Sequence, residues 1–145
     1  MRKFEKVSYN DSGVIPTRAD DRSAGYDVYS PIAFSIKPNE IVKIETNIKC
    51  QLEEYDVLMI YPRSSIGIKK NIMLANTTGV IDSSYYNNES NEGNIIIALY
   101  NYGDKIQHFD VGDRIAQAVI QPFLTVDNDI IIGDKRIGGI GSSGK

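Results

Sequence analysis

A chain of 145 residues is the size of one domain, and its 41% hydrophobic and 24% charged residues are ordinary for a folded globular protein. The net charge of −3 provides no broad cationic surface, so direct binding to nucleic acid or to an anionic membrane is not expected. One cysteine and one histidine exclude an internal disulfide and a zinc site built from Cys and His.

The N-terminal segment MRKFEKVSYNDSGVIP lacks the apolar stretch of a signal peptide, and no uninterrupted apolar run is long enough to span a bilayer. We therefore expect a cytoplasmic protein, or one of the host cytoplasm if the gene is viral.

Alternation of apolar and polar residues predicts a β-rich fold. The clearest case is 42–52, where apolar or β-branched residues at even positions predict one half-buried strand. Shorter runs of β-branched and aromatic residues predict strands at 57–61, 95–100, 114–121 and 130–132. Helical periodicity is confined to a short stretch after Pro62. Many short strands separated by turns favour an all-β jelly-roll or barrel-like sandwich over a parallel α/β sheet.

The stretch AGYDVYS at 24–30 places Asp27 among aromatic and β-branched residues. A buried carboxylate without a partner is costly, so Asp27 needs one. Two interpretations are open: a strand-entry residue bonded to nearby backbone, or an outer-shell ligand of a hydrated metal ion. Mg²⁺ usually keeps several of its waters, so a single carboxylate that reaches it through water suits the second interpretation.

The stretch PRSSIGIK at 62–69 sets Arg63, Ser64 and Ser65 at the expected start of the short helix. Backbone amides at a helix start face anions, and arginine adds a forked, charged donor. In the simpler interpretation Ser64 is only an N-cap. The three residues together favour a phosphate site.

The stretch NTTGVIDSSYY at 76–86 places Asp82 after Gly79, Val80 and Ile81. Glycine permits backbone geometry that is closed to other residues, and the aliphatic pair would shield Asp82 from bulk water. Partial desolvation raises the pKa of a carboxyl group, which suits a general base that takes a proton from water. The alternative is a turn residue, since Asp followed by Ser is common in bends.

Two further stretches carry polar groups. GDRIAQAVI at 112–120 predicts a strand in which Gln117 shares a face with Ile115 and Val119, either bonded to neighbouring backbone or projecting into a polar pocket. RIGGIGSSGK at 136–145 is rich in glycine, hydroxyls and cations, but it lacks the Ser or Thr after the lysine and the following helix that a P-loop requires. It is either a strip of backbone amides that wraps a polyphosphate or an untethered tail.

In this order the five stretches closely resemble the motifs of the trimeric dUTPase family, and the resemblance extends from AGYDVYS to the end of the chain. The resemblance implies a homotrimer of jelly-roll-like, distorted β-barrels (the dUTPase-like β-clip) that hydrolyses dUTP to dUMP and pyrophosphate with Mg²⁺. It also implies that subunits share each active site. Residues 1–133 would form the β domain, and residues 134–145 an arm that closes over the bound nucleotide.

The resemblance implies roles for individual residues as well. Asp82 looks like the base that activates water for attack on the α-phosphorus, and Tyr85 like the aromatic residue beneath the deoxyribose, which leaves no space for a 2′-hydroxyl. The other implied contacts are with uracil (Asn76, Gly79, Val80, Ile81), with the phosphates (Arg63, Ser64, Ser65, Gln117 and, in the arm, Arg136, Gly141, Ser142, Ser143) and with magnesium-bound water (Asp27).

Two features depart from the family's pattern. Ile140 stands where the family usually has an aromatic residue that stacks over uracil, so weaker arm closure is expected. The stretch YYNNESNEG at 85–93 is longer than the usual tight hairpin, which leaves Glu89, Glu92 and Ile96 without an implied role.

Two other functions are compatible with such a fold. A dCTP deaminase is similar in fold, but it calls for a glutamate near the base, whereas this chain offers Asp82 and a full glycine-rich arm. A nucleotide-gated regulator that binds another protein is the second alternative. The chain retains every catalytic residue type that the resemblance implies, which favours an enzyme.

Overall fold

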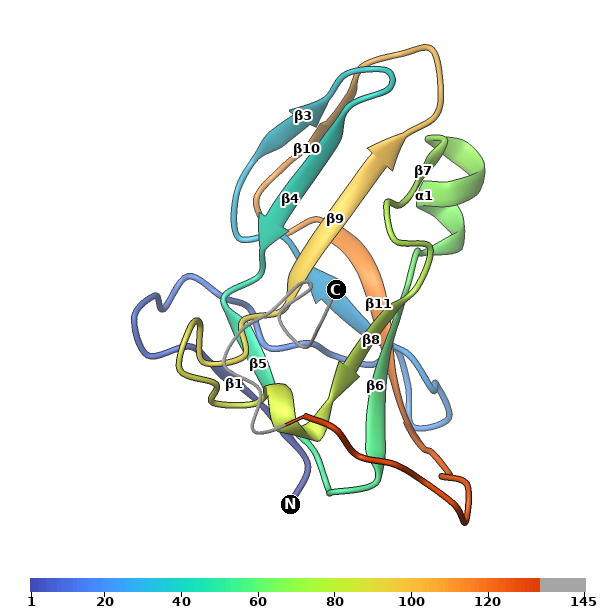
Figure 1. Ribbon diagram of the computed structural model, residues 1–145. Helices are drawn as coiled ribbons and strands as arrows, with labels where there is room; N and C mark the ends of the chain where they lie inside the picture. The colour runs from blue at the N-terminus through green and yellow to red at the C-terminus, as the bar shows by residue number, and fades with distance from the viewer. Residues whose placement is uncertain (134–145) are drawn as a thin grey trace.

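The structure is a computed structural model that describes residues 1–133. Over these residues the chain forms eleven β-strands, one short α-helix and one 3-10 helix (Figure 1). The elements in chain order are β1 (Lys3–Lys6), β2 (Tyr26–Tyr29), β3 (Phe34–Ile36), β4 (Ile41–Glu45), β5 (Ile48–Gln51), β6 (Asp56–Tyr61), α1 (Ser64–Lys69), β7 (Ile72–Leu74), β8 (Gly79–Asp82), η1 (Ser83–Tyr85), β9 (Ile96–Asn101), β10 (Gln107–Phe109) and β11 (Arg114–Pro122). The expected all-β fold and the short helix after Pro62 are confirmed, while the jelly-roll detail stays a prediction.

Within residues 1–133 the strands pair into four antiparallel sheets. The largest has the order β2-β11-β6-β8, and a three-stranded sheet has the order β4-β9-β7. Two smaller sheets pair β1 with β5 and β3 with β10. In Figure 1, β4 and β9 lie in the upper half of the molecule and β6 and β8 in the lower half, and α1 connects β6 to β7 at the right-hand edge.

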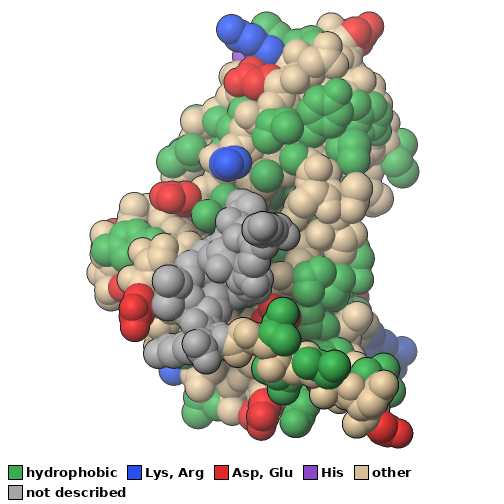
Figure 2. Space-filling model, viewed as in Figure 1, with side chains coloured by type: hydrophobic (Ala, Val, Ile, Leu, Met, Phe, Trp, Pro, Cys, Tyr) green, Lys and Arg blue, Asp and Glu red, His purple; other side chains and the backbone are tan. Residues whose placement is uncertain are grey.

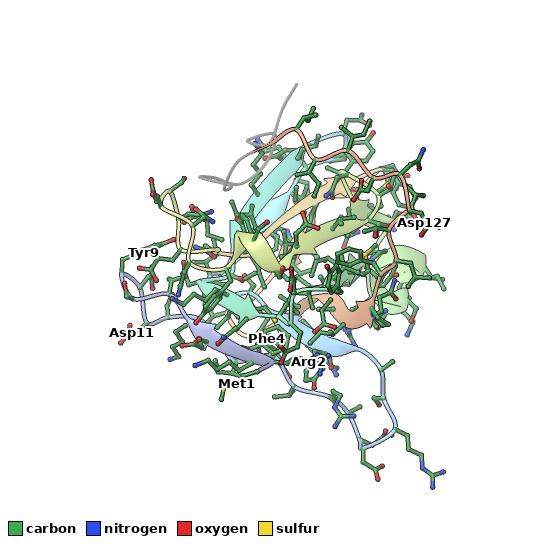
Figure 3. All side chains as sticks on the ribbon, turned by 60° about the horizontal axis from the view of Figure 1, so that its bottom comes forward. Met1, Arg2, Phe4, Tyr9, Asp11 and Asp127 are labelled. Carbon is green, nitrogen blue, oxygen red and sulfur yellow. The ribbon has the colours of Figure 1, made fainter. Side chains whose placement is uncertain are left out.

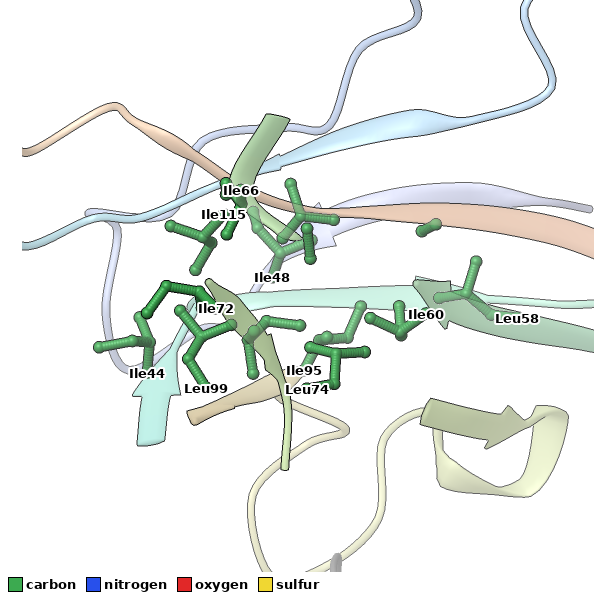
Figure 4. Close-up of a cluster of buried hydrophobic side chains, with 14 of the residues drawn as sticks. Ile44, Ile48, Leu58, Ile60, Ile66, Ile72, Leu74, Ile95, Leu99 and Ile115 are labelled. Carbon is green, nitrogen blue, oxygen red and sulfur yellow. The ribbon is translucent and has the colours of Figure 1, made fainter. Parts of the chain in front are cut away.

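A cluster of buried aliphatic side chains joins the two larger sheets (Figure 4). Ile44, Leu74 and Leu99 come from the three-stranded sheet, and Leu58 and Ile60 come from β6. Each of these side chains is at most 3% exposed. Burying one such side chain contributes about 1.5–3 kcal/mol, so this cluster fixes β6 against β9.

The stretch 42–52, predicted to be one strand, is two strands that belong to different sheets. β4 pairs with β9, whereas β5 pairs with β1, and the chain turns between them at Thr46 and Asn47. Asn47 has a positive φ of 60°, which asparagine tolerates better than most residues. Its N–H donates to Asn94 Oδ1 (2.9 Å) and Thr46 Oγ1 donates to Ile95 O (2.7 Å), so the buried turn keeps its polar groups satisfied.

The predicted strand at 130–132 is wrong. Ile130, Ile131 and Ile132 are 81%, 84% and 96% exposed, and none of them pairs with another strand within residues 1–133. Their β-branched side chains suit a strand, but composition alone supplies no neighbouring strand.

The single cysteine, Cys50, lies on β5 and is only 3% exposed. Burial, helped by the nearby Asp56 carboxylate, raises the pKa of the Cys50 thiol to about 12. The thiol therefore stays protonated at neutral pH, and a protonated thiol is a poor nucleophile.

Candidate active site

A cavity of about 440 Å³ lies beside β8, with further walls from β4, β6, β7, β9 and η1. This volume is within the range of small-molecule sites. The cavity brings together the five residues predicted to contact the base and the sugar, which are Asn76, Gly79, Val80, Ile81 and Tyr85.

β8 can form a wall of the cavity because Gly79 has no side chain. Gly79 pairs with Ile60 of β6, and a Cβ atom at position 79 would lie 2.9 Å from Ile60 Cβ and 3.1 Å from Ile60 Cγ1. Non-bonded carbon atoms normally approach to about 3.5–4.0 Å, so only glycine fits here without displacing a neighbour. β8 is the last strand of its sheet over residues 1–133, so its outer backbone groups are not used by the sheet and can meet a ligand.

Asp82 ends β8 at the border of this cavity. Its side chain is half-buried and its backbone is extended, with φ −84° and ψ 160°. Although Asp82 directly precedes η1, its side chain makes no capping hydrogen bond to that turn.

Tyr85 lies in η1 and is 7% exposed. Its hydroxyl donates to Asn94 O at 2.7 Å and accepts from Asn91 Nδ2 at 2.9 Å. The ring therefore presents a fixed apolar surface to the cavity that it lines.

A second cluster of polar side chains lies where β2, β11 and the start of α1 meet. Arg63 Nε is 3.2 Å from Asp27 Oδ1, and Arg114 Nη1 is 3.5 Å from Asp27 Oδ2. Two guanidinium groups thus hold one carboxylate, and each keeps other N–H donors for an anion. Arg114 was not predicted as a site residue, although its place inside the GDRIAQAVI stretch was the available signal.

Helix α1 begins one residue earlier than it would if Ser64 were its N-cap. Arg63 is the N-cap residue and Ser64 is the first helical residue, so the interpretation of Ser64 as an N-cap is wrong. Arg63 Nη1 donates to Ser65 Oγ at 3.3 Å, which brings these two predicted residues together, and Ser64 is exposed next to them.

Gln117 joins the second cluster from β11, where it pairs with Asp27 of β2 and Tyr61 of β6. Its Nε2 donates to Pro62 O at 3.2 Å. A Cβ atom on Gly25 would lie 2.6 Å from Gln117 Oε1, so this glycine makes room for the amide. The nitrogen end of the Gln117 amide is therefore held by a hydrogen bond, and Gly25 leaves space for its oxygen end.

Gln117 does not share a face with Ile115, contrary to the prediction. A β-bulge lies between Arg114 and Ala116, and it breaks the alternation of β11. Ile115 is consequently 0% exposed in the core, whereas Gln117 is half-buried.

Asp82 and the arginine cluster lie at opposite ends of β6. Val57 at one end pairs with Asp82, and Tyr61 at the other end pairs with Gln117. The four residue steps between Val57 and Tyr61 span roughly 13 Å of strand. Within one chain, Asp82 therefore lies well apart from the arginine cluster.

Five predicted contacts, Arg136, Ile140, Gly141, Ser142 and Ser143, lie outside the described residues. Within residues 1–133 no group of three or more His, Cys, Asp or Glu side chains is placed to hold a metal ion. The same part of the chain contains no helix with the length and apolar character needed to cross a membrane.

Comparisons with known proteins match nearly the whole chain. A family model described as dUTPase matches residues 11–144. The deoxyuridine 5′-triphosphate nucleotidohydrolase of Lactococcus lactis subsp. lactis (strain IL1403) is 40% identical over 147 residues, which cover 99% of this chain and 98% of that protein.

Solved structures agree in fold. The crystal structure of dUTPase from Streptococcus mutans superposes with a TM-score of 0.81 at 35% identity, and the match covers 87% of this chain and 99% of that chain. A mutant dUTPase from phage phi11 of S. aureus, described for its coordination of a structural Mg(II) ion, has a TM-score of 0.75 at 20% identity and covers 90% of this chain and 96% of its own.

Proposed function

This chain belongs to the dUTPase family, whose enzymes hydrolyse dUTP to dUMP, and we propose that Asp82 is the general base of that reaction. Asp82 takes a proton from a water molecule while the oxygen of that water attacks the α-phosphorus. The bond from that phosphorus to the bridging oxygen breaks, and dUMP and pyrophosphate leave. The observation that carries the proposal is the cavity of about 440 Å³ beside the end of β8, which gathers the five predicted base and sugar contacts next to Asp82.

The cavity takes the uracil and the deoxyribose. The outer backbone groups of the edge strand β8, in the stretch that holds Val80 and Ile81, pair with the edge of uracil, with Asn76 beside them, and their donor pattern rejects cytosine. The cavity wall beside Gly79 sterically excludes the methyl group of thymine. Tyr85 packs beneath the deoxyribose and excludes a 2′-hydroxyl, a role that its buried and doubly hydrogen-bonded ring supports.

The second cluster takes the phosphates. Arg63 and Arg114 supply fixed positive charge, and Ser64, Ser65 and Gln117 supply neutral hydrogen bonds around them. Asp27 orients both guanidinium groups, because its two carboxylate oxygens each face one arginine. Cleavage of a phosphoanhydride chiefly requires neutralised charge and an aligned water, which these side chains provide together with Asp82.

The active site is completed by another copy of the chain in a homotrimer. Asp82 and the arginine cluster lie at opposite ends of β6, so one subunit does not bring its own base to its own phosphate contacts. Ile41 and Val80, which line the cavity, are 55% and 59% exposed, as expected for a site that a neighbouring subunit covers. Apolar side chains also gather in patches on the face shown in Figure 2.

Asp27 is compatible with a hydrated magnesium ion, because each of its carboxylate oxygens faces one arginine and keeps lone-pair capacity for a metal-bound water. A lone carboxylate cannot build an all-protein cage, but magnesium usually keeps waters and binds through one or two carboxylates together with substrate phosphates. Asp27 faces the proposed phosphate cluster and would hold such waters, and the relative from phage phi11 carries a structural Mg(II) ion. When bound, magnesium offsets part of the triphosphate's charge.

Residues 1–133 form the β domain of this proposal, and residues 134–145 form an arm that covers the nucleotide. Arg136, Gly141, Ser142 and Ser143 would meet the phosphates, and Ile140 would lie over uracil. The cytoplasmic location expected from the sequence stays a prediction.

Pyrophosphate release tests the activity, measured with dUTP, dCTP, dTTP and UTP side by side, with magnesium and after its removal by EDTA. We expect release from dUTP with magnesium and little from the other three nucleotides. Ammonia release from dCTP would instead support the deaminase alternative. In the variant Asp82→Asn we expect retained dUTP binding and a turnover lower by roughly 10²–10⁴. Full turnover in Asp82→Asn would remove Asp82 from the role of base.

Subunit mixing tests the shared site. Asp82→Asn and Arg63→Ala chains are each expected to be nearly inactive, and in randomly mixed trimers about a quarter of the sites combine an intact Asp82 from one chain with an intact Arg63 from another. Activity should therefore reappear on co-expression. If co-expressed trimers stay inactive, both groups act within one subunit, contrary to the proposal.

A further inference from the structure

The loop that follows Tyr85 is longer than a tight hairpin, and it folds back onto the Tyr85 side chain. Resting on the role proposed above for Tyr85, we propose that Asn91 is a positioning residue: it fixes the Tyr85 ring through the ring hydroxyl and thereby sets the preference for a deoxyribose over a ribose substrate.

The Tyr85 hydroxyl is held between two partners from this loop. Asn91 Nδ2 donates to Tyr85 Oη at 2.9 Å, and Tyr85 Oη donates to Asn94 O at 2.7 Å. The hydroxyl thus uses both its acceptor and its donor function, and its proton is directed toward the Asn94 carbonyl. A ring held in this way cannot tilt without breaking at least one hydrogen bond.

The orientation of the Asn91 amide is itself determined by its neighbours. Asn91 Oδ1 accepts from Gly93 N at 3.0 Å and from Asn88 Nδ2 at 2.8 Å. Both partners are donors, so the oxygen must face them and the Nδ2 group must face Tyr85. A flipped amide would set donors against donors and leave the Tyr85 hydroxyl with a second acceptor.

The backbone of Tyr85 is fixed by the same loop. Asn88 is 2% exposed, and its Nδ2 also donates to Tyr85 O at 2.9 Å. Gly93 has a φ of 91°, and a Cβ atom there would lie 2.8 Å from Tyr85 O. The loop therefore depends on glycine to approach Tyr85 this closely, and it contacts both the main chain and the hydroxyl of that residue.

The loop is in turn attached to the sheets. Glu92 accepts from Lys49 Nζ and from the Ser8 backbone N–H, each at 3.0 Å. Asn94 Nδ2 donates to the hydroxyl of Tyr9, which lies in the segment after β1 and is labelled in Figure 3. The residues on the C-terminal side of Asn91 are thus fixed to other parts of the chain, and Asn91 connects this fixed loop to the Tyr85 hydroxyl.

A rigid ring matters because ribose and deoxyribose differ by one hydroxyl. If the ring beneath the sugar cannot retreat, the extra 2′-hydroxyl of UTP has no space; if the ring is released, it can tilt and admit UTP. Loss of the Asn91 hydrogen bond should therefore change selectivity, whereas a purely structural role would lower activity on both nucleotides alike.

The experiment compares kcat/KM for dUTP and UTP in the full-length wild type, Asn91→Ala, Tyr85→Phe and the double variant. Ser90→Ala is the matched control in the same loop, because Ser90 is exposed and, within residues 1–133, only its backbone N–H is bonded, to Asn88 Oδ1. We expect the dUTP-to-UTP ratio to fall by roughly twofold to tenfold in Asn91→Ala, mainly through a lower KM for UTP, and to stay unchanged in Ser90→Ala.

The double variant distinguishes an effect of Asn91 through the Tyr85 hydroxyl from a general loss of rigidity in the loop. If Asn91 acts through the Tyr85 hydroxyl, the double variant should resemble Tyr85→Phe, which removes both hydrogen bonds of that hydroxyl, rather than show the product of both effects. An unchanged ratio in a folded Asn91→Ala enzyme would overturn the inference. If thermal melting shows that Asn91→Ala does not fold, Tyr85→Phe decides, because it removes the Asn91 hydrogen bond together with the one to Asn94 and keeps the ring, and an unchanged ratio in that variant would overturn the inference. A wild-type chain that releases no pyrophosphate from dUTP would overturn the proposed function together with this inference.

Discussion

Gly79→Ala tests whether the close approach of β8 to β6 shapes the nucleotide cavity. The added methyl group would lie 2.9 Å from Ile60 Cβ and 3.1 Å from Ile60 Cγ1, against an ordinary carbon–carbon contact of about 3.5–4.0 Å. No rotamer of Ile60 relieves the first contact, because a Cβ atom moves only with the backbone. Ile60 is 3% exposed within the core, so β8 is the strand that must move, by about 0.5–1 Å.

This displacement has two measurable effects. Overpacking of this kind costs about 1–3 kcal/mol, which lowers Tm by roughly 3–10 °C for a domain of this size. Val80 and Ile81 move with Gly79, so the cavity wall shifts, and a misplacement of about 1 Å can lower kcat/KM for dUTP by up to roughly 10²-fold.

The assays are calorimetric Tm measurement and pyrophosphate release from dUTP, with Gly67→Ala as the matched control. A Cβ atom on Gly67 would have one neighbour, Ile72 O at 3.7 Å, so Gly67→Ala should be neutral or stabilising in its helix. A Gly79→Ala enzyme with a lower Tm but unchanged kcat/KM would refute the assignment of this cavity to the nucleotide. An unchanged Tm would refute the steric argument itself.

Three further outcomes are expected. Hydrogen bonds from Ser8 and the Lys49 ammonium lower the pKa of Glu92 from 4.5 to about 2. The contribution of Glu92 to stability is therefore present above about pH 4.5 and is lost as the pH falls toward 2. Glu92→Gln should flatten the fall of Tm across that window, and identical curves of Tm against pH for the variant and the wild type would contradict this. Arg63→Lys keeps the charge but loses the fork that meets Asp27 and Ser65, so KM for dUTP should rise about tenfold without loss of Tm, and an unchanged KM would argue against a phosphate contact. Ile140→Phe should tighten dUTP binding by up to roughly 1–3 kcal/mol, measured as a lower KM, whereas an unchanged KM would mean that the arm does not cover the base.

Local pattern predicted the longer strands. The strands expected at 57–61, 95–100 and 114–121 correspond to β6, β9 and β11 within a residue or two, because β-branched and aromatic runs of that length rarely fit another structure. Strands of three or four residues, such as β3 and β10, were missed because they are too short to show a period.

The predictions that were wrong share one physical cause: a local stretch of sequence does not specify which distant residues it will pair with. The turn at Asn47 depends on Asn94, far along the chain, to satisfy its backbone N–H. The bulge at Ile115 depends on the register between β11 and β2. The segment 130–132 has strand composition but pairs with no strand of residues 1–133.

The same limit applies to the candidate site. The stretch 76–86 contains Asn76, Gly79, Val80, Ile81 and Tyr85, all of which line the cavity, so this part of the site lies within one local piece of sequence. Arg114 was missed because its significance comes from sharing Asp27 with Arg63, which no spacing along the chain reveals. The loop that holds Tyr85 was visible only as an unusually long hairpin, and its role emerged from the hydrogen bonds of Asn88 and Asn91.

The inert thiol on β5 makes this chain convenient for site-specific labelling. Because Cys50 is the only cysteine and is shielded from solvent, maleimide reagents should leave the native enzyme unmodified. A single exposed replacement such as Ser90→Cys would then carry one fluorophore per subunit. Emission from that dye would report, without background from other sulfhydryls, how the loop after Tyr85 responds as nucleotide enters and leaves.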